Sequence, residues 1–378
     1  MAYLKLKDVC QINMGQSPDS SSYNADGDGI PFFQGNADFG ERYPLTQKWC
    51  NNPIKIAKVN DILISVRAPI GAVNYAKENC CIGRGLAAIT PDTGKVSSEF
   101  IYWFLKGKNE ELNSKGTGST FKAIGRKVLE EVEIPDIDFD TQRRYAATLE
   151  KIYLLIQVRK KELEQFDDLI KARFVEMFGN ESKRVAVSSV CDVSGGYSFK
   201  SGDISSNGVV KILQIGNVYL DDLNWETTNY LPEGFDYAYS GFLLNEGDVV
   251  IALTRPIIKA LGNVKACIVK ESDMPCLLNQ RVGRIVPKQN VDVSMKFVYR
   301  CFMTDDFTRY VESCCIGCSQ PNISTKDIEN YMIPDISYAE QMTFVKFIDQ
   351  VDKSKVAVQK ALDETQTLFD SLMQEYFG

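Results

Sequence analysis

The stretch GSTFKAIGRKVLEEVEIP (118–135) has a divergent second copy, GCSQPNISTKDIENYMIP (317–334), at an offset of 199 residues. Each copy has a loop that begins with glycine, then a short helix signal, then a closing Ile-Pro. In the second copy, Ser324 is followed three residues later by Asp327, which is a helix-capping pattern with Asp in the usual place of Glu. The stretch therefore predicts that one structural unit occurs twice in the chain.

The repeat extends over nearly the whole sequence. It pairs LKDVCQINMGQS (6–17) with VSSVCDVSGGYS (187–198), NDILISVRAPIG (60–71) with GDVVIALTRPII (247–258), and GRGLAAITP (83–91) with NQRVGRIVP (279–287). The offset grows from 181 and is constant from residue 118 onward. The length differences fall between residues 36 and 61 and between residues 73 and 83. We therefore expect variable loops in the first part of each copy and a fixed second part.

Each copy ends in a long helix signal, close to 60 Å at roughly 1.5 Å per residue. Stepping by four and three gives one seam of Tyr145, Leu149, Ile152, Ile156, Leu163, Phe166, Ile170 and Met177, and a second of Phe344, Ile348, Val351, Val358, Leu362, Phe369, Leu372 and Tyr376. Only Arg159, Arg173, Lys355 and Thr365 interrupt the two seams. A period of 3.5 predicts a coiled coil, and a twofold relation between the copies makes it antiparallel. The alternative is that each helix packs on its own globular domain.

The predicted fold class is α+β, with two similar mixed domains separated by a long antiparallel two-helix coiled coil and related by pseudo-twofold symmetry. We expect domains at residues 1–139 and 180–339, and coiled-coil helices at residues 140–179 and 340–378. Within the domains we expect strands at 61–66 and 248–253 and helices at 97–107 and 294–303.

Composition excludes several classes of protein. The chain has 378 residues, of which 44% are hydrophobic and 25% charged, as in ordinary globular proteins. No apolar run approaches the roughly 18 residues needed to span a membrane, so a cytoplasmic location is expected. The 11 cysteines are scattered and there is no histidine. Reduced thiols are therefore expected, and the metal-like spacing of Cys315 and Cys318 is interpreted as two small buried side chains without metal.

Several soft motifs, found twice in the same order, carry a resemblance to a known family. They are the opening LKDVCQINMGQSP, the strand and turn DILISVRAPIG, the GST loop, the pattern from Ile-Pro to glutamine (134–142 and 333–341) and the helices that end in Phe-Gly. The arrangement resembles the specificity subunit (S, HsdS) of type I restriction-modification systems. The resemblance implies a non-catalytic protein whose two target-recognition domains each read one half of a split DNA sequence.

The resemblance also implies partners and a role for the helices. The coiled coil would set the spacing between half-sites and dock two modification subunits that methylate adenine with S-adenosylmethionine, a cofactor of those subunits and not of this chain. A restriction and translocase subunit could join the complex. Double-stranded DNA is the implied ligand, and no membrane is involved.

A DNA methyltransferase and a protein-only adaptor are the two alternatives to a DNA-recognition subunit. A DNA methyltransferase needs a glycine-rich cofactor loop and an Asn/Asp-Pro-Pro-aromatic tetrapeptide. The nearest strings, Asn51-Asn52-Pro53-Ile54 and Gly83-Arg84-Gly85, supply neither. A protein-only adaptor acting through its coiled coil remains open. The net charge of −7 opposes strong duplex binding, so weak DNA binding by the isolated chain is expected.

Candidate DNA contacts follow from residue chemistry, since phosphates are met by Lys, Arg, Ser and Thr and bases by Arg, Asn and Gln. In the first copy the candidates are Gln16, Ser17, Tyr23, Arg67, Arg84, Ser119, Thr120 and Lys122. In the second copy they are Tyr197, Ser198, Lys200, Arg255, Asn279, Gln280, Arg281, Ser319, Gln320 and Asn322. Arg67 and Arg255 are favoured by their paired placement near a proline. For Gln34 and Gln214 a structural turn and a DNA contact are both open.

Overall fold

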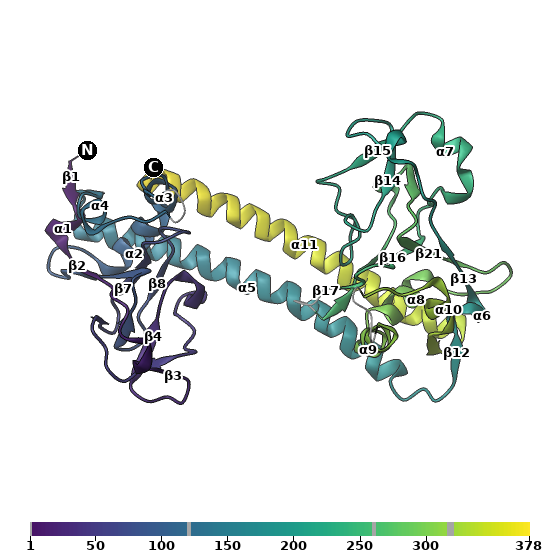
Figure 1. Cartoon of the computed structure of the whole chain (residues 1–378), viewed down its shortest axis with the longest axis horizontal. Coiled ribbons are helices and arrows are strands. Elements are labelled where there is room, and N and C mark those ends of the chain that lie inside the picture. Colours follow the sequence, from purple (N-terminus) through teal and green to yellow (C-terminus); the bar gives the residue numbers. More distant parts are fainter. Residues whose placement is uncertain (1, 119–121, 259–261, 316–320) are drawn as a thin grey trace. The chain divides into compact units, whose positions relative to one another are not determined.

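The computed structural model describes residues 2–118, 122–258, 262–315 and 321–378 (Figure 1). The chain divides into two compact units. Unit 1 comprises Met1–Glu162 and Val358–Gly378, and unit 2 comprises Leu163–Ala357. Both divisions fall inside a long helix, so each unit contains one part of each of the two long helices.

Unit 1 contains two main sheets, with strand orders β2-β10-β7-β8 and β3-β5-β4-β9-β6, and β1 pairs with β11. Its strands are β1 (Tyr3–Lys5), β2 (Cys10–Met14), β3 (Tyr23–Asn24), β4 (Ile30–Phe33), β5 (Trp49–Cys50), β6 (Ile56–Ala57), β7 (Ile62–Ser65), β8 (Val73–Tyr75), β9 (Cys80–Ile82), β10 (Leu86–Pro91) and β11 (Glu133–Pro135). Its helices are α1 (Leu6–Val9), α2 (Ser98–Gly107), α3 (Asn109–Ser114), α4 (Arg126–Glu130) and the first part of α5 (Phe139–Phe178).

Unit 2 repeats the four-stranded sheet and the pairing of its first and last strands, but its second sheet is different. Its sheets have strand orders β13-β21-β16-β19 and β15-β14-β20, β12 pairs with β22, and β17 pairs with β18. Its strands are β12 (Arg184–Ala186), β13 (Cys191–Gly195), β14 (Val210–Leu213), β15 (Asn229–Leu231), β16 (Val249–Ala252), β17 (Ile257–Ile258), β18 (Asn263–Val264), β19 (Ala266–Ile268), β20 (Cys276–Leu278), β21 (Val282–Pro287) and β22 (Met332–Pro334). Its helices are α6 (Val187–Val190), α7 (Phe235–Ala238), α8 (Met295–Phe302), α9 (Asp305–Cys314), α10 (Thr325–Asn330) and the first part of α11 (Tyr338–Phe377).

The predicted strands and helices are confirmed at β7, β16, α2 and α8, each within two residues of the expected ends. The capping pattern before α10 is also confirmed. The Ser324 backbone N–H donates to Asp327 Oδ2 (2.7 Å), and the Asp327 backbone N–H donates to Ser324 Oγ (3.1 Å). Two backbone donors that the helix itself cannot satisfy are thereby bonded.

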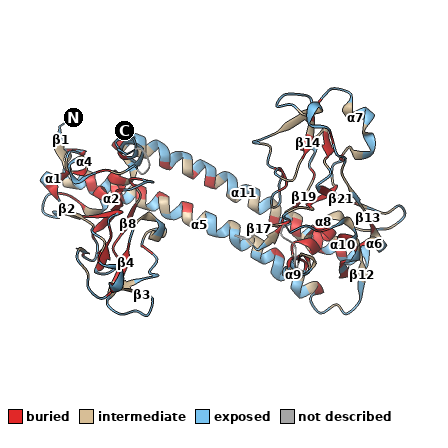
Figure 2. Ribbon diagram, viewed as in Figure 1, coloured by how far each residue is buried: buried red, intermediate tan, exposed pale blue. Residues whose placement is uncertain are grey.

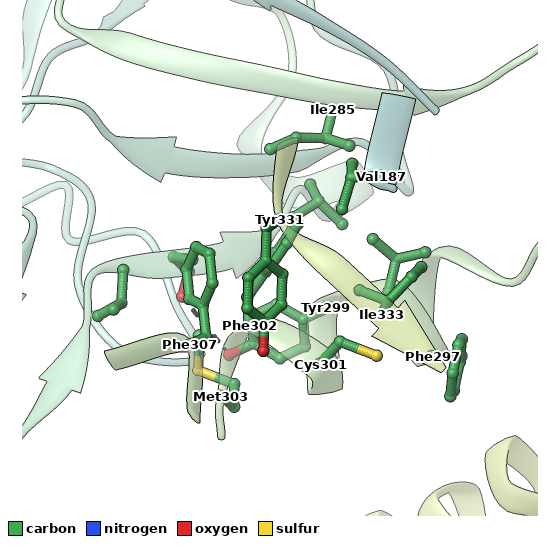
Figure 3. Close-up of a cluster of buried hydrophobic side chains, with 14 of the residues drawn as sticks. Val187, Ile285, Phe297, Tyr299, Cys301, Phe302, Met303, Phe307, Tyr331 and Ile333 are labelled. Atoms are coloured by element: carbon green, nitrogen blue, oxygen red, sulfur yellow. Dashed lines mark hydrogen bonds between the residues drawn. The ribbon is translucent and has the colours of Figure 1, made fainter. Parts of the chain in front are cut away.

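The core of unit 2 forms where α8, α9 and α10 pack against the sheet strands. Figure 3 shows Phe302, Phe307 and Tyr331 gathered in this core, with ring centroids 4.7 Å apart for Phe302 and Phe307 and for Phe307 and Tyr331. Phe297 and Phe302 are fully buried. Aromatic pairs of this kind add stabilisation beyond the apolar area that they bury.

The helices α5 and α11 run antiparallel within each unit. In unit 1, the rings of Tyr145 and Tyr376 stack at 3.8 Å, and farther along α5 Arg159 donates hydrogen bonds to Thr365 Oγ1 and to a nearby backbone carbonyl of α11. In unit 2, Lys355 Nζ lies 2.7 Å from Asp167 Oδ1. Positions rise along one helix as they fall along the other, which confirms the predicted antiparallel pairing.

The predicted seam also corresponds to the covered face of each helix. Every seam residue is buried or half-buried, whereas apolar residues off the seam such as Leu154, Leu155 and Val158 are 50–54% exposed. Figure 2 shows buried and intermediate residues interspersed with exposed ones along both long helices. Two of the four interruptions pair with each other, since Arg159 of one seam bonds Thr365 of the other. Lys355 and Arg173 instead pair with Asp167 and Glu176. A buried polar pair such as that of Arg159 and Thr365 fixes register more than it adds stability.

The ends of the two helices pack on the globular part formed by the other copy of the repeat. Phe377 ends the second copy but lies in unit 1, where its ring is 5.6 Å from Phe100 and 5.7 Å from Phe104 of α2. Phe178 ends the first copy but lies in unit 2, 5.4 Å from Phe297 of α8. Mutual pairing and packing on a domain therefore both occur. Each helix packs on its own domain over its first part, as Tyr153 does on Trp103 (5.4 Å) and Asp349 on Lys296 (2.6 Å), and on the other domain at its end.

The described cysteines of the globular parts are mostly buried thiols. Burial raises the pKa of Cys80 and of Cys81 to about 12, which keeps both groups protonated near neutral pH. Cys318 lies outside the described residues. Across the part of the chain that the structure describes, no helix combines the length and apolar character needed to span a membrane.

Candidate nucleic-acid interface

One end of the four-stranded sheet of unit 1 collects predicted contact residues. β2 ends at Met14 opposite Ala87, and β7 ends at Ser65 opposite Leu86, because both strands run antiparallel to β10. The chain leaving β2 and β7 therefore emerges where the chain enters β10. The flanking segments at this end carry Gln16, Ser17, Arg67 and Arg84.

A cleft at this end, here cleft 1, is lined by Ser17, Pro18, Asp19, Ser20, Tyr23, Gln34 and Arg84. Gln34 Nε2 donates to Ser17 Oγ (2.9 Å), and the Arg84 backbone N–H donates to the same oxygen (3.2 Å). The Tyr23 hydroxyl donates to the Pro18 carbonyl (2.8 Å), and burial raises the pKa of this phenol. Cleft 1 thus presents hydroxyl, amide and guanidinium groups, which can bind phosphate oxygens and base edges.

Arg67 and Lys122 lie on two neighbouring segments, one after β7 and the other before α4. The Ala68 backbone N–H donates to the Lys122 carbonyl (3.1 Å), and Arg67 forms a β-bridge with Ala123. Both cationic residues are exposed. Ser119 and Thr120, which were also predicted as contacts, lie outside the described residues.

Unit 2 has an equivalent cleft at the equivalent end of its sheet. β13 ends at Gly195 opposite Gly283, and β16 ends at Ala252 opposite Val282. The cleft, here cleft 2, is lined by Phe199, Ser201, Ile204, Gln214, Ile215, Gly216, Asn217, Thr227, Thr228, Asn229, Asn279, Gln280 and Arg281. It is richer in side-chain amides than cleft 1.

The predicted residues that precede cleft 2 have two different environments. Tyr197 is 38% exposed, and its ring lies 4.8 Å from Tyr239 and 5.3 Å from Phe242, so it belongs to an aromatic cluster. Ser198 and Lys200 are exposed on either side of Phe199, which lines the cleft. These two remain free to meet a ligand, whereas Tyr197 also has a packing role.

The structure shifts the predicted pairing of Arg67 with Arg255 by one residue. Arg67 bridges Ala123, and the equivalent bridge in unit 2 joins Thr254 to Asn322. Thr254 is therefore the counterpart of Arg67, and Arg255 follows it with a positive φ of 50°, a conformation that costs energy for a side chain other than glycine. Asn322 is exposed beside it, whereas Ser319 and Gln320 lie outside the described residues.

Gln34 and Gln214, left open by the sequence, both line the clefts. Each follows the strand that pairs in parallel with β9 or β20. The Gln34 backbone N–H donates to Asp38 Oδ2 (2.6 Å), and the Gln214 backbone N–H donates to Asn217 Oδ1 (3.0 Å). In each unit the glutamine backbone forms a structural turn while its side chain lines the cleft. A structural turn and a DNA contact are therefore compatible at this position. The signal in the sequence was the recurrent Gly-Asn after each glutamine.

Asn229 is a cleft residue that sequence reasoning missed. Its Nδ2 donates to Gln214 Oε1 (2.7 Å), which orients the Gln214 amide. Asn229 lies in β15, inside the region where the two copies differ in length, so comparing the copies gave no signal for it.

Some arginines of unit 1 are held in ion pairs within the protein, whereas others have no such partner and could bind a ligand. In unit 1, Arg42 forms an ion pair with Glu150 (2.8 Å), and Arg126 forms one with Glu130 (2.7 Å). No ion pair joins Arg67 or Arg84 to any residue that the structure describes. Their guanidinium groups therefore keep donors available for a ligand.

A chain that builds one mixed domain twice, each with a cleft of hydroxyl, amide and guanidinium groups, has the design of a tandem recognition protein. The family described as "Type I restriction modification DNA specificity domain" matches residues 1–165 and again residues 180–365. The chain therefore belongs to this family of DNA specificity domains.

Two relatives from Methanocaldococcus jannaschii are among the similar sequences. The putative type I restriction enzyme MjaX specificity subunit is 45% identical over 157 residues, covering 42% of this chain and only 37% of that protein. The type I restriction enzyme MjaVIII specificity subunit is 29% identical over 294 residues, covering 71% of this chain and 68% of that protein. The matched segments thus span from about a third to two thirds of these relatives.

Solved structures show the same fold over the full chain. The type I restriction-modification S subunit from M. genitalium has a TM-score of 0.59 at 16% identity and covers 100% of this chain and 96% of that chain. A chain from the complex assembly of a type I restriction-modification system has a TM-score of 0.60 at 15% identity. At these identities the likeness concerns the fold alone.

Proposed function

We propose that this chain is the DNA-specificity subunit of a type I restriction-modification complex, and that each unit reads one half of a bipartite DNA target. The observation that carries the proposal is the repeated cleft, formed at the same end of the same sheet in both units and lined by polar groups suited to DNA. Family membership supports it. In this proposal the chain recognises DNA and performs no chemistry.

The long helices support the second part of the proposal, which concerns partners. Leu154, Leu155 and Val158 form an exposed apolar group on α5, 50–54% exposed, on the face away from the seam. Exposed apolar groups of this kind favour protein docking. We assign this face to modification subunits that methylate adenine with S-adenosylmethionine, and a restriction subunit could join them. The helices would then also set the spacing between the half-sites.

The charge of the chain fits a reader that works inside a complex. Its net charge is −7, and a protein that binds duplex DNA alone usually presents a strongly basic face. The few unpaired cations at the clefts would orient bases and phosphates, and partners would supply much of the remaining phosphate contact. Weak binding by the isolated chain and strong binding by the assembled complex are the expected result.

The test is a genome-wide map of N6-methyladenine in the native host with and without this gene. Loss of methylation at one split motif supports the proposal and reveals both half-sites together. If the gene is transcribed and the map is unchanged, the DNA-reading function is wrong, and an adaptor that binds only proteins through α5 and α11 becomes the better account.

A further inference from the structure

Each cleft is lined by the middle residue of a three-residue turn, and the two turns occupy equivalent places in the two units. In unit 1 the turn from β9 to β10 is Gly83-Arg84-Gly85, and in unit 2 the turn from β20 to β21 is Asn279-Gln280-Arg281. Each middle residue projects from a turn of the same length between the same two strands. Arg84 and Gln280 are both exposed and both line their cleft.

Matched hydrogen bonds establish the equivalence. The Gly83 N–H donates to the Phe33 carbonyl (2.8 Å), as the Asn279 N–H donates to the Leu213 carbonyl (3.1 Å). The Gly85 carbonyl accepts from the N–H that follows β7 (2.9 Å), as the Arg281 carbonyl accepts from the N–H that follows β16 (2.9 Å). The residues on both sides of the middle position are therefore held alike by the backbone.

The surroundings also make the turn rigid. A Cβ on Gly83 would meet the Gln34 side chain at 2.9 Å, and one on Gly85 would meet the Gln34 carbonyl at 2.4 Å. Gly15 likewise lets its strand approach the Gly83 carbonyl closely. Close backbone packing leaves little freedom for the turn, and a rigid support is what a base-reading side chain needs.

The side chains at the two middle positions are available and differ in chemistry. The side chains of Arg84 and Gln280 form no ion pair and no hydrogen bond with any residue that the structure describes; only their backbone N–H groups are bonded. Asp19 also lines cleft 1, but its carboxylate is engaged by the Ser21 N–H (2.9 Å) and hydroxyl (2.7 Å). Arg84 offers only donors, whereas Gln280 offers a donor and an acceptor.

We propose that Arg84 and Gln280 are equivalent specificity-determining residues that read different bases, guanine in one half-site and adenine in the other. The inference rests on the proposed function and deepens it. A guanidinium bonds two acceptors on guanine, and a side-chain amide matches the donor and acceptor pair of adenine. Turns with equivalent backbone bonds but different middle residues thus give the two halves of the target different sequences.

The experiment uses the full chain expressed with its modification subunits in a host without adenine methylation, and single-molecule sequencing of the methylated genome. The variants are Arg84→Gln and Gln280→Arg. The control is Arg126→Gln, which removes an exposed arginine of unit 1 that is paired with Glu130 and distant in sequence from the turn. The control is expected to leave the motif unchanged.

Arg84→Gln should change one base of one half-site from guanine towards adenine and leave the other half-site unchanged. Gln280→Arg should change one base of the opposite half-site from adenine towards guanine. The ratio of methylation at the two alternative sequences should shift roughly 5- to 150-fold in each case. A variant that methylates the original motif with unchanged base preference, or whose methylation is still measurable but is lowered equally on all sequences, overturns the assignment.

An inactive variant and an inactive wild-type complex are two further outcomes, and each has its own interpretation. If a variant shows no methylation, fluorescence anisotropy of the purified variant complex on duplexes carrying each of the four bases at that position decides the question, and equal affinity for all four overturns the inference. If the wild-type complex itself methylates no split motif, the proposed function has failed, whatever the variants do.

Discussion

Replacing Phe377 by alanine is expected to destabilise unit 1, although this residue ends the second copy of the repeat. Phe377 is only 4% exposed and contacts the buried rings of Phe100 and Phe104. Truncating a buried Phe to Ala typically costs about 3–5 kcal/mol of the free energy of unfolding. Amides that exchange by unfolding of unit 1 should then exchange roughly 150- to 5,000-fold faster.

The assay is hydrogen exchange followed by mass spectrometry, with peptides from α2 and β7 reporting on unit 1 and peptides from α8 and β16 on unit 2. Phe178→Ala is the reciprocal variant, since Phe178 contacts Phe297 and Phe344 in unit 2. Leu368→Ala is the matched control on α11, because Leu368 is 50% exposed and such changes usually stay within about 0.5 kcal/mol. Loss of protection in α8 and β16, with α2 and β7 unaffected, would refute the reasoning for Phe377.

Three further predictions concern the helices and one buried cation. Replacing Arg159 by Leu and Thr365 by Val together removes a polar pair from the seam and should leave the unfolding temperature unchanged or raise it; a clear fall in calorimetry would contradict this. Burial, and after it the charge of Arg42, lowers the pKa of Lys106 in the folded state to about 8, whereas the pKa of a lysine in the unfolded state is about 10.4. Between these two pH values the unfolded state binds a proton that the folded state does not. Unit 1 should therefore gain about 1–2 kcal/mol of stability as pH rises from about 8 to 9.5, and Lys106→Met should abolish this gain in denaturant titrations at the two pH values. Adding four residues to either α5 or α11 should change the spacing of the methylated half-sites or abolish methylation without unfolding either globular part; unchanged spacing would disprove the role of the helices as a ruler.

The long helices could be predicted from the sequence because a seam is a local pattern. Seam positions such as Leu149 and Phe344 are covered as expected, and the helix ends lie within about two residues of the expected ones. What covers the helix ends could not be predicted. The period identifies the apolar face, but it carries no information on whether the covering residues come from the same copy or the other.

The clefts could be predicted in part. Ser17 and Arg84 follow recurrent motifs and do lie together. Strands of the second sheet, such as β4 and β6, are short and gain their identity from pairing with β9, which is distant in sequence, so they left no periodic signal. Arg255 was paired with Arg67 because each stands close to a proline, whereas the alignment of 60–71 with 247–258 places Arg67 opposite Thr254, and the backbone pairing agrees with that alignment.

The location of Phe369 and Phe377 has a consequence for synthesis of the chain. Both residues pack on α2 of unit 1, yet they are translated after the whole of unit 2. Unit 1 must therefore wait, incompletely folded, until α11 has been translated. A nascent chain that stops before Phe369 would lack the rings that cover α2, so only chains that have completed unit 2 can complete unit 1.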